Sequence, residues 1–258
     1  MEPALPGEIE ARALLAGPLT DVLKNILMAC CRPLFWFALD PAAPRILANG
    51  TLTLVQTPER IFGITAAHVI RDYIATRAIC PIRAQISEVV VDDLLDRVID
   101  RSDLLDLATV DLGGGLLEAL GAGVSPLTCW PPIPPQEGKG IMLAGFPGCE
   151  RREPARLEGL FGLSWAIGIA RNVTHDQITW IVPSAEFLIA GDSPLPKNYD
   201  FGGASGGPLI ASHESASGLF THRLAGIISE AHAGFEYIVA KRADSIEADG
   251  KIGPLPIY

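Results

Sequence analysis

The stretch Gly203-Ala204-Ser205-Gly206-Gly207-Pro208 places one serine between small residues on both sides. A serine hydroxyl is a weak nucleophile at neutral pH. Catalysis by serine therefore needs a base, a carboxylate that orients the base, and hydrogen-bond donors for the developing oxyanion. Glycines beside the serine let backbone N–H groups turn inward and let a substrate strand lie close. The alternative interpretation is a tight glycine-rich turn without catalytic function, so the choice depends on partners elsewhere in the chain.

A candidate base, His68, lies in Thr65-Ala66-Ala67-His68, directly after an apolar run over residues 60–65 that predicts a strand. Imidazole suits general base catalysis because its charge changes near neutral pH. The alternative for a single histidine beside an apolar strand is a structural role.

A candidate for the orienting carboxylate is Asp106, which opens the apolar segment Asp106-Leu107-Ala108-Thr109-Val110. A carboxylate buried beside a histidine fixes the tautomer of the ring. Asp103 and Asp111 are close competitors, and a surface carboxylate is the alternative interpretation for all three.

These three motifs, in the order histidine, aspartate, serine, resemble those of the trypsin/chymotrypsin-fold serine peptidases, in particular the bacterial trypsin-like peptidases. The similarity runs from about residue 34 to about residue 246. The resemblance implies a serine endopeptidase in which Ser205 attacks the peptide carbonyl, His68 carries the proton and Asp106 orients the imidazole. An inactive protein-binding module of the same fold and an esterase with the same triad remain alternatives.

The resemblance also implies a substrate-binding surface. The backbone N–H groups of Gly203 and Ser205 would form the oxyanion hole. The stretch Leu224–Ser229 resembles the strand that pairs with bound substrate, so Ser229, Glu230 and Ala231 would line an extended peptide. The alternative for Glu230 is a solvated rim charge.

By the pattern of this family, Tyr199 and Asp200 fall near the base of the primary specificity pocket. Asp200 there would favour arginine or lysine in the substrate; the alternative is that its side chain caps a turn before Phe201. Ala204 stands where secreted trypsins carry an aspartate, so activation through a buried new N-terminus is not expected. Ordering of the loop 190–203 is a hypothesis for control of activity.

The serine stretch also fits the G-x-S-x-G elbow of the α/β-hydrolases, in which a helix follows the serine. Here Gly206, Gly207 and Pro208 precede the apolar residues 209–211, which indicate a strand because glycine is a poor helix former. The elbow also needs its acid and histidine after the serine, where too little chain remains. We therefore reject this interpretation.

The resemblance implies an all-β fold of two six-stranded antiparallel β-barrels with short N-terminal and C-terminal helices. The expected division is an N-terminal helical extension (1–31), a first barrel carrying histidine and aspartate (32–120), a proline-rich connector (121–139), and a second barrel carrying serine plus a terminal helix (140–258).

Local signals give three further expectations. Thr20 or Asp21 would cap the N-terminal helix, and residues 243–248 would form the terminal helix typical of the family. Asn49-Gly50 is a favoured hairpin-turn dipeptide and predicts a turn between two strands.

Composition limits the other function classes. Apolar residues make up 48% and charged residues 19% of the 258 residues, which excludes a largely disordered chain. A net charge of −10 argues against nucleic acid as the principal ligand. Five cysteines without a disulfide pattern, and acidic residues near the start, predict a reduced cytoplasmic protein without export signal or membrane span. The expected partners are a protein or peptide substrate and a regulatory protein; no metal or cofactor is expected.

Overall fold

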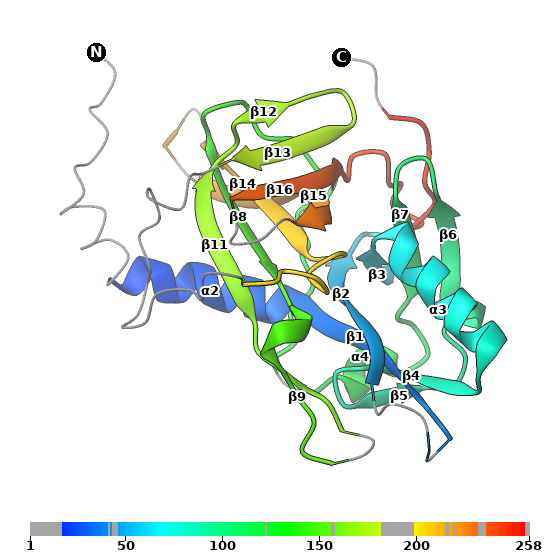
Figure 1. Cartoon of the computed structure of the whole chain (residues 1–258). Helices are drawn as coiled ribbons and strands as arrows, with labels where there is room; N and C mark the ends of the chain where they lie inside the picture. The colour runs from blue at the N-terminus through cyan, green and yellow to red at the C-terminus, as the bar shows by residue number, and fades with distance from the viewer. Residues whose placement is uncertain are drawn as a thin grey trace.

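The computed structural model describes residues 17–40, 42, 46–121, 123–155, 158–181, 199–214, 217–218, 220–231 and 236–255. Two antiparallel sheets, each curled into a half-barrel, make up most of this part of the chain (Figure 1). The expected all-β fold with two antiparallel barrels is confirmed, with seven strands in each sheet where six were expected.

The first sheet has the strand order β5-β4-β1-β2-β3-β7-β6. Its strands are β1 (Cys31–Ala38), β2 (Ile46–Gln56), β3 (Ile61–Thr65), β4 (Ile82–Ile86), β5 (Val89–Val91), β6 (Val98–Ser102) and β7 (Leu107–Asp111).

The second sheet has the order β11-β8-β14-β15-β16-β13-β12. Its strands are β8 (Gly140–Gly145), β11 (Ser164–Ile169), β12 (Asn172–Val173), β13 (Gln177–Ile181), β14 (Pro208–Glu214), β15 (Phe220–Ala231) and β16 (Tyr237–Arg242). A separate short pair joins β9 (Arg151–Arg152) to β10 (Leu160–Phe161).

Asn49 and Gly50 do not form the expected turn. Both lie inside β2, where they pair with Phe35 and Leu34 of β1. The neighbouring strand supplies backbone partners that a local turn would lack, so tertiary pairing overrides the turn preference of the dipeptide.

Each sheet encloses its own apolar core, and a third cluster joins them. Val55, Phe62 and Leu107 of the first sheet are buried with Leu224 and Ile227 of β15 in the second. Full burial of one such side chain stabilises the fold by about 1.5–3 kcal/mol. This junction fixes the relative position of the two sheets.

Three helices and two 3-10 turns complete the described elements: α2 (Pro18–Cys30), α3 (Ala67–Ile79), α4 (Leu116–Ala119), η1 (Leu95–Arg97) and η2 (Gly148–Glu150). The expected N-terminal helix is present, but Thr20 and Asp21 do not cap it. It begins earlier, at Pro18, because proline is favoured in the first turn, where its missing N–H has no partner to lose. Leu27 and Cys30 of α2 pack against β8 of the second sheet.

The terminal helix expected over residues 243–248 does not form. Residues 243–245 make a turn, and Ile246 pairs with Ile252 in an isolated bridge. The segment then returns to the first sheet, where Thr109 Oγ1 donates to the Gly250 carbonyl at 2.6 Å. These contacts with the first sheet take the place of helical hydrogen bonds.

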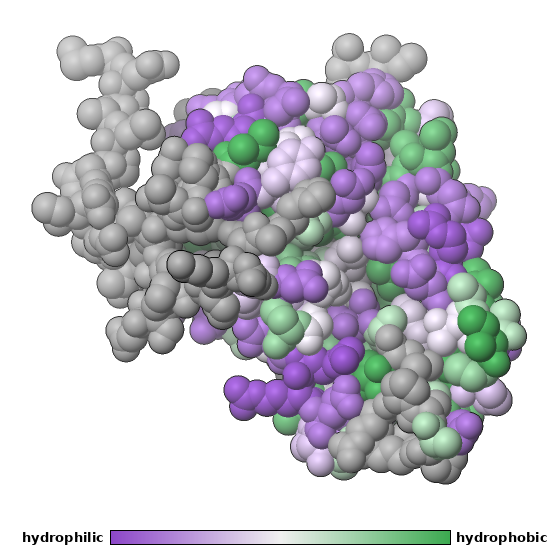
Figure 2. Space-filling view, in the orientation of Figure 1, coloured by the Kyte–Doolittle hydropathy of each residue, from purple (hydrophilic) through white to green (hydrophobic). Residues whose placement is uncertain are grey.

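Polar side chains cover much of the coloured part of the face in Figure 2, and a small apolar area lies over the end of α3, where Ile79 is 86% exposed. Among the described helices, none has the length and apolar character needed to cross a bilayer.

Candidate active site

His68 is the second residue of α3, directly after β3. The first N–H groups of a helix lack partners within the helix, and no side chain of the preceding Ala66 caps this one. Instead the His68 backbone N–H donates to Asp106 Oδ1 at 2.9 Å. The His68 ring also faces this carboxylate, with Nδ1 2.9 Å from Oδ2 and 3.1 Å from Oδ1. The helix terminus and the imidazole therefore both bind Asp106.

Asp106 lies between a turn and β7 with φ at +51°, a left-handed conformation that aspartate tolerates better than most residues. Its carboxylate also accepts a hydrogen bond from Ser229 Oγ at 2.5 Å. Burial alone would raise the pKa of Asp106, but the hydrogen bonds from His68 and Ser229 outweigh it and hold this pKa below its usual value. The carboxylate is therefore ionised at neutral pH and accepts from Nδ1–H of His68. In the neutral ring, Nε2 then carries the lone pair that a general base needs.

The two competing carboxylates are held elsewhere. Asp103 is 52% exposed and pairs with Arg71 at 3.4 Å and with Arg101 at 3.3 Å. Asp111 pairs with Arg60 at 2.7 Å. Of the three candidates, only Asp106 contacts His68.

Ser205 is linked to this pair through β15. Its Oγ donates to the Ser229 carbonyl at 3.2 Å, and Ser229 Oγ in turn donates to Asp106. Among the described residues, Ser205 Oγ makes no hydrogen bond to His68. The surroundings of Gly50 also show that Ser205 lies near the start of α3. A Cβ on Gly50 would lie 2.7 Å from Val69 Cγ1 and 3.3 Å from the Ser205 carbonyl oxygen. Ser205 thus lies close to the residue that follows His68.

The two predicted oxyanion donors have free N–H groups. Neither Gly203 nor Ser205 donates its backbone N–H to any acceptor in the described part of the chain, although both carbonyls are bound. The neighbouring N–H groups are occupied: Ala204 donates to Phe201 and Gly206 donates to Ile228. Free N–H groups two residues apart, one of them on the serine itself, can bind an oxyanion.

Ser229 occupies a bulge in β15, because Ile228 pairs with Ala240 of β16 while Glu230 already pairs with Val239. Bulges re-aim side chains and are frequent beside active sites. The pairing of β14 with β15 ends at Ile227. Residues 229–231 lie beyond that end, with Glu230 exposed. Among the described strands, only β16 pairs with these residues.

Both expected specificity residues, Tyr199 and Asp200, have hydrogen-bond partners within the described part of the chain. Tyr199 is buried in the core of the second sheet, where its hydroxyl bonds to Ser164 and donates to Glu150 at 3.0 Å. Burial raises the pKa of Tyr199. The Asp200 carboxylate accepts the Gly202 N–H at 2.8 Å. Asp200 thus caps its own loop, as the alternative interpretation had it. Residues 182–198, which include most of the proposed control loop, lie outside the described part of the chain.

Sequence reasoning missed the part that β2 plays. The Thr51 N–H donates to the Ser205 carbonyl at 2.8 Å, and Thr51 Oγ1 donates to the Gly203 carbonyl at 3.0 Å. β2 of the first sheet thus holds the serine segment of the second. The only sequence signal was the Asn49-Gly50 dipeptide, which indicated a turn.

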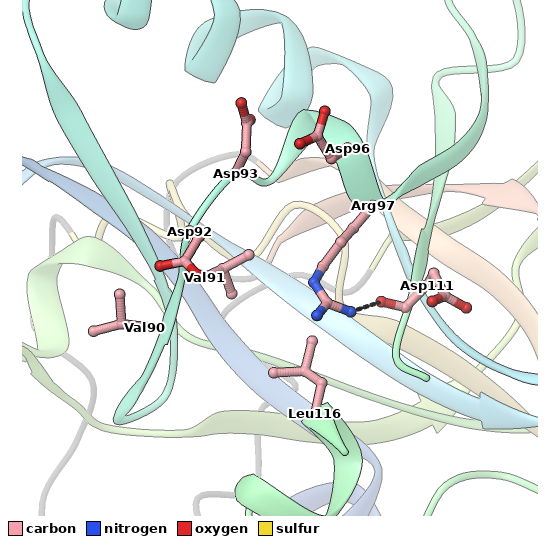
Figure 3. A pocket seen from close by; sticks show the side chains of 8 residues that line it. All are labelled: Val90, Val91, Asp92, Asp93, Asp96, Arg97, Asp111 and Leu116. Atoms are coloured by element: carbon pink, nitrogen blue, oxygen red, sulfur yellow. Dashed lines mark hydrogen bonds between the residues drawn. The ribbon is translucent and has the colours of Figure 1, made fainter. Parts of the chain in front are cut away.

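A pocket of about 380 Å³ lies elsewhere on the first sheet (Figure 3). Valines and aspartates around η1 line it, and Arg97 points into it while bonded to the Asp111 carbonyl. It shares no residue with the His68, Asp106 and Ser205 group. In the described ranges, no cluster of three or more His, Cys, Asp or Glu side chains fits a metal ion.

No model of a protein family matches the chain, and no curated protein matches it. A solved structure described as the crystal structure of Deg5 is similar, with 15% sequence identity and a TM-score of 0.45 over 90% of each chain. A similarity at this level says nothing about the activity of this chain.

Ser229→Ala is expected to lower the free energy of unfolding by about 1.5–3 kcal/mol at pH 7, because the ionised Asp106 loses one donor. The folded-state pKa of Asp106 lies below its ordinary value. Its stabilising effect is therefore present above the ordinary carboxyl range and is lost as the pH falls through the folded pKa. The difference in unfolding free energy between wild type and variant should narrow as the pH falls below the ordinary carboxyl range, as denaturant unfolding at several pH values would measure. A difference that stays constant would contradict this account of Asp106.

Proposed function

We propose that this chain is a serine endopeptidase of the trypsin/chymotrypsin-like type, with Ser205 as nucleophile, His68 as base and Asp106 as orienting carboxylate. The observation that carries the proposal is the chain of contacts from Ser205 Oγ to the Ser229 carbonyl, from Ser229 Oγ to Asp106, and from Asp106 to His68 Nδ1. Three residues far apart in sequence are thereby connected through Ser229.

In the proposed mechanism, rotation about the side-chain bond of Ser205 releases its hydroxyl from the Ser229 carbonyl and turns it toward His68 Nε2. Ser205 Oγ attacks the peptide carbonyl as His68 takes its proton, and the imidazolium then protonates the leaving amine. Asp106 stabilises the imidazolium and stays ionised. The free N–H groups of Gly203 and Ser205 bind the oxyanion. Water then releases the acyl group by the same steps.

The proposed substrate is an extended peptide that pairs with residues 229–231 beyond the end of β14. Glu230 is exposed at this edge, and its charge favours basic side chains in the substrate. The described cysteines are all free thiols, which supports the proposal that the protein works in a reducing compartment.

A second candidate is a protein-binding module without activity. It is favoured by the hydrogen bond that Ser205 Oγ makes to the Ser229 carbonyl in place of His68. A serine that never turned toward the imidazole would not be activated.

Covalent labelling distinguishes these functions. We expect a fluorophosphonate probe to label the protein, with the adduct mapped by mass spectrometry to the peptide that contains Ser205. Turnover of a peptide library and of matched esters would then separate a peptidase from an esterase and report cleavage preference. A folded protein that takes up no probe at Ser205 would exclude a serine hydrolase and leave the binding module.

A further inference from the structure

Asn49 reaches from the first sheet to the second. Its Nδ2 donates to the Phe146 carbonyl at 2.8 Å, directly after the end of β8. A carbonyl oxygen only accepts hydrogen bonds, so the nitrogen of the amide must face it, and this fixes the orientation of the Asn49 side chain.

The same amide nitrogen lies against Gly203. A Cβ on Gly203 would be 2.3 Å from Asn49 Nδ2 and 3.0 Å from the Phe146 carbonyl oxygen. The Asn49 amide thus fills the space in which a side chain at position 203 would begin. Gly203 has φ at +98°, a conformation that side chains rarely adopt. The backbone of Gly203 is therefore packed against the side chain of Asn49, which comes from the first sheet.

Thr51 completes this contact two residues further along β2. Its Oγ1 accepts the Phe146 N–H at 3.0 Å and donates to the Gly203 carbonyl at 3.0 Å. Phe146 is thus bound by Asn49 through its carbonyl and by Thr51 through its N–H. The backbone of Gly203 is held between the same two side chains, while its own N–H stays free.

We propose that Asn49 is a positioning residue for catalysis, which holds the Gly203 peptide so that its N–H faces the oxyanion. The inference rests on the proposed function, because it assigns Gly203 as an oxyanion donor. Asn49 acts through Gly203 and Phe146 and does not touch the substrate. Since the contact crosses between the sheets, it also makes the oxyanion donor sensitive to their relative position.

Asn49→Ala tests this proposal. We expect kcat for a cleaved peptide to fall on the order of tenfold to hundredfold, because small displacements of an oxyanion donor weaken transition-state binding strongly. KM should change less than about twofold, since the substrate strand is untouched. Affinity for a peptide aldehyde, whose adduct needs the oxyanion hole, should fall in parallel with kcat. A merely structural role would not separate kcat from KM in this way.

Asn172→Ala is the matched control, because Asn172 is exposed on β12 at the edge of the second sheet; it should keep both constants. Asn49→Ser serves if the alanine variant does not fold, and its hydroxyl, which is able to donate, should restore part of kcat. An Asn49 variant that folds and cleaves with wild-type kcat would overturn this inference alone. A wild-type protein that reacts with no probe at Ser205 would overturn the proposed function and this inference together.

Discussion

Asp106→Asn is expected to lower peptide turnover about ten-thousandfold while the protein stays folded. The reason is the tautomer of His68, because the new amide would move the ring proton from Nδ1 to Nε2. Steady-state kinetics of the purified variant would measure the loss, and thermal unfolding would show that the fold is kept.

The hydrogen bonds around Asp106 determine how an asparagine would sit. Oδ1 accepts the His68 backbone N–H, which can only donate, so the amide oxygen must take this place. The amide NH₂ then takes the place of Oδ2, beside His68 Nδ1 and Ser229 Oγ. It would donate to Nδ1, which forces the ring proton onto Nε2. The ring would then have no lone pair for the serine proton, while the Ser229 hydroxyl can turn to accept and keep the site intact.

Asp103→Asn is the control, because Asp103 lies three residues earlier and is exposed in ion pairs with Arg71 and Arg101. Exposed pairs of this kind contribute about 0–1 kcal/mol to stability. Turnover of this variant should remain near that of wild type. Equal losses in the two variants would show that a general change of charge, and not the tautomer of His68, controls the activity.

The sequence predicted His68, Asp106 and Ser205 as a group because each residue has a distinctive local setting. His68 follows an apolar strand, Asp106 precedes one, and Ser205 lies among glycines. The expected two-sheet architecture was also confirmed. What a single sequence lacks is the contact between these segments, which depends on the packing of both sheets.

The role of Ser229 shows this limit. Its sequence position predicted only a place along the substrate; the structure adds that the bulge in β15 turns its hydroxyl to Asp106 and that its carbonyl accepts from Ser205 Oγ. The bulge arises because β15 has one more residue than β16 at this point of the pairing. The sequence of β15 alone contains no reliable signal of such a mismatch. The contribution of Asn49 was hidden in the same way, because the dipeptide Asn49-Gly50 predicts a turn in isolation and forms a strand when β1 lies beside it.

The missing terminal helix has a related cause. The sequence of residues 243–248 permits a helix, but the segment instead makes contacts that are distant in the chain. Thr57 Oγ1, directly after β2, donates to the Ala248 carbonyl at 2.7 Å, and Ile246 packs against the junction of the two sheets. Non-local burial here outweighs local helix preference, which is small for each residue.

Gly207→Ala is expected to destabilise the protein by roughly 4 kcal/mol or more, at the upper end for single substitutions. A Cβ at this position would lie 2.0 Å from the Ala144 carbonyl oxygen and 2.9 Å from the Ala204 carbonyl oxygen. Both obstacles are backbone atoms, so no side chain can rotate away. Relief would require β8 and the serine segment to move apart. Denaturant unfolding would measure the loss, and fluorophosphonate labelling of Ser205 should fall with it.

Gly140→Ala separates this steric effect from the general cost of replacing a glycine. Gly140 begins β8, the strand that carries Ala144, and a Cβ there would meet nothing within 4 Å. Its stability should change by less than about 1 kcal/mol, with the reduced freedom of the unfolded chain favouring the variant. If Gly207→Ala were equally harmless, β8 and the serine segment would have room to separate. The close approach of the serine segment to β8 would then not be needed for folding.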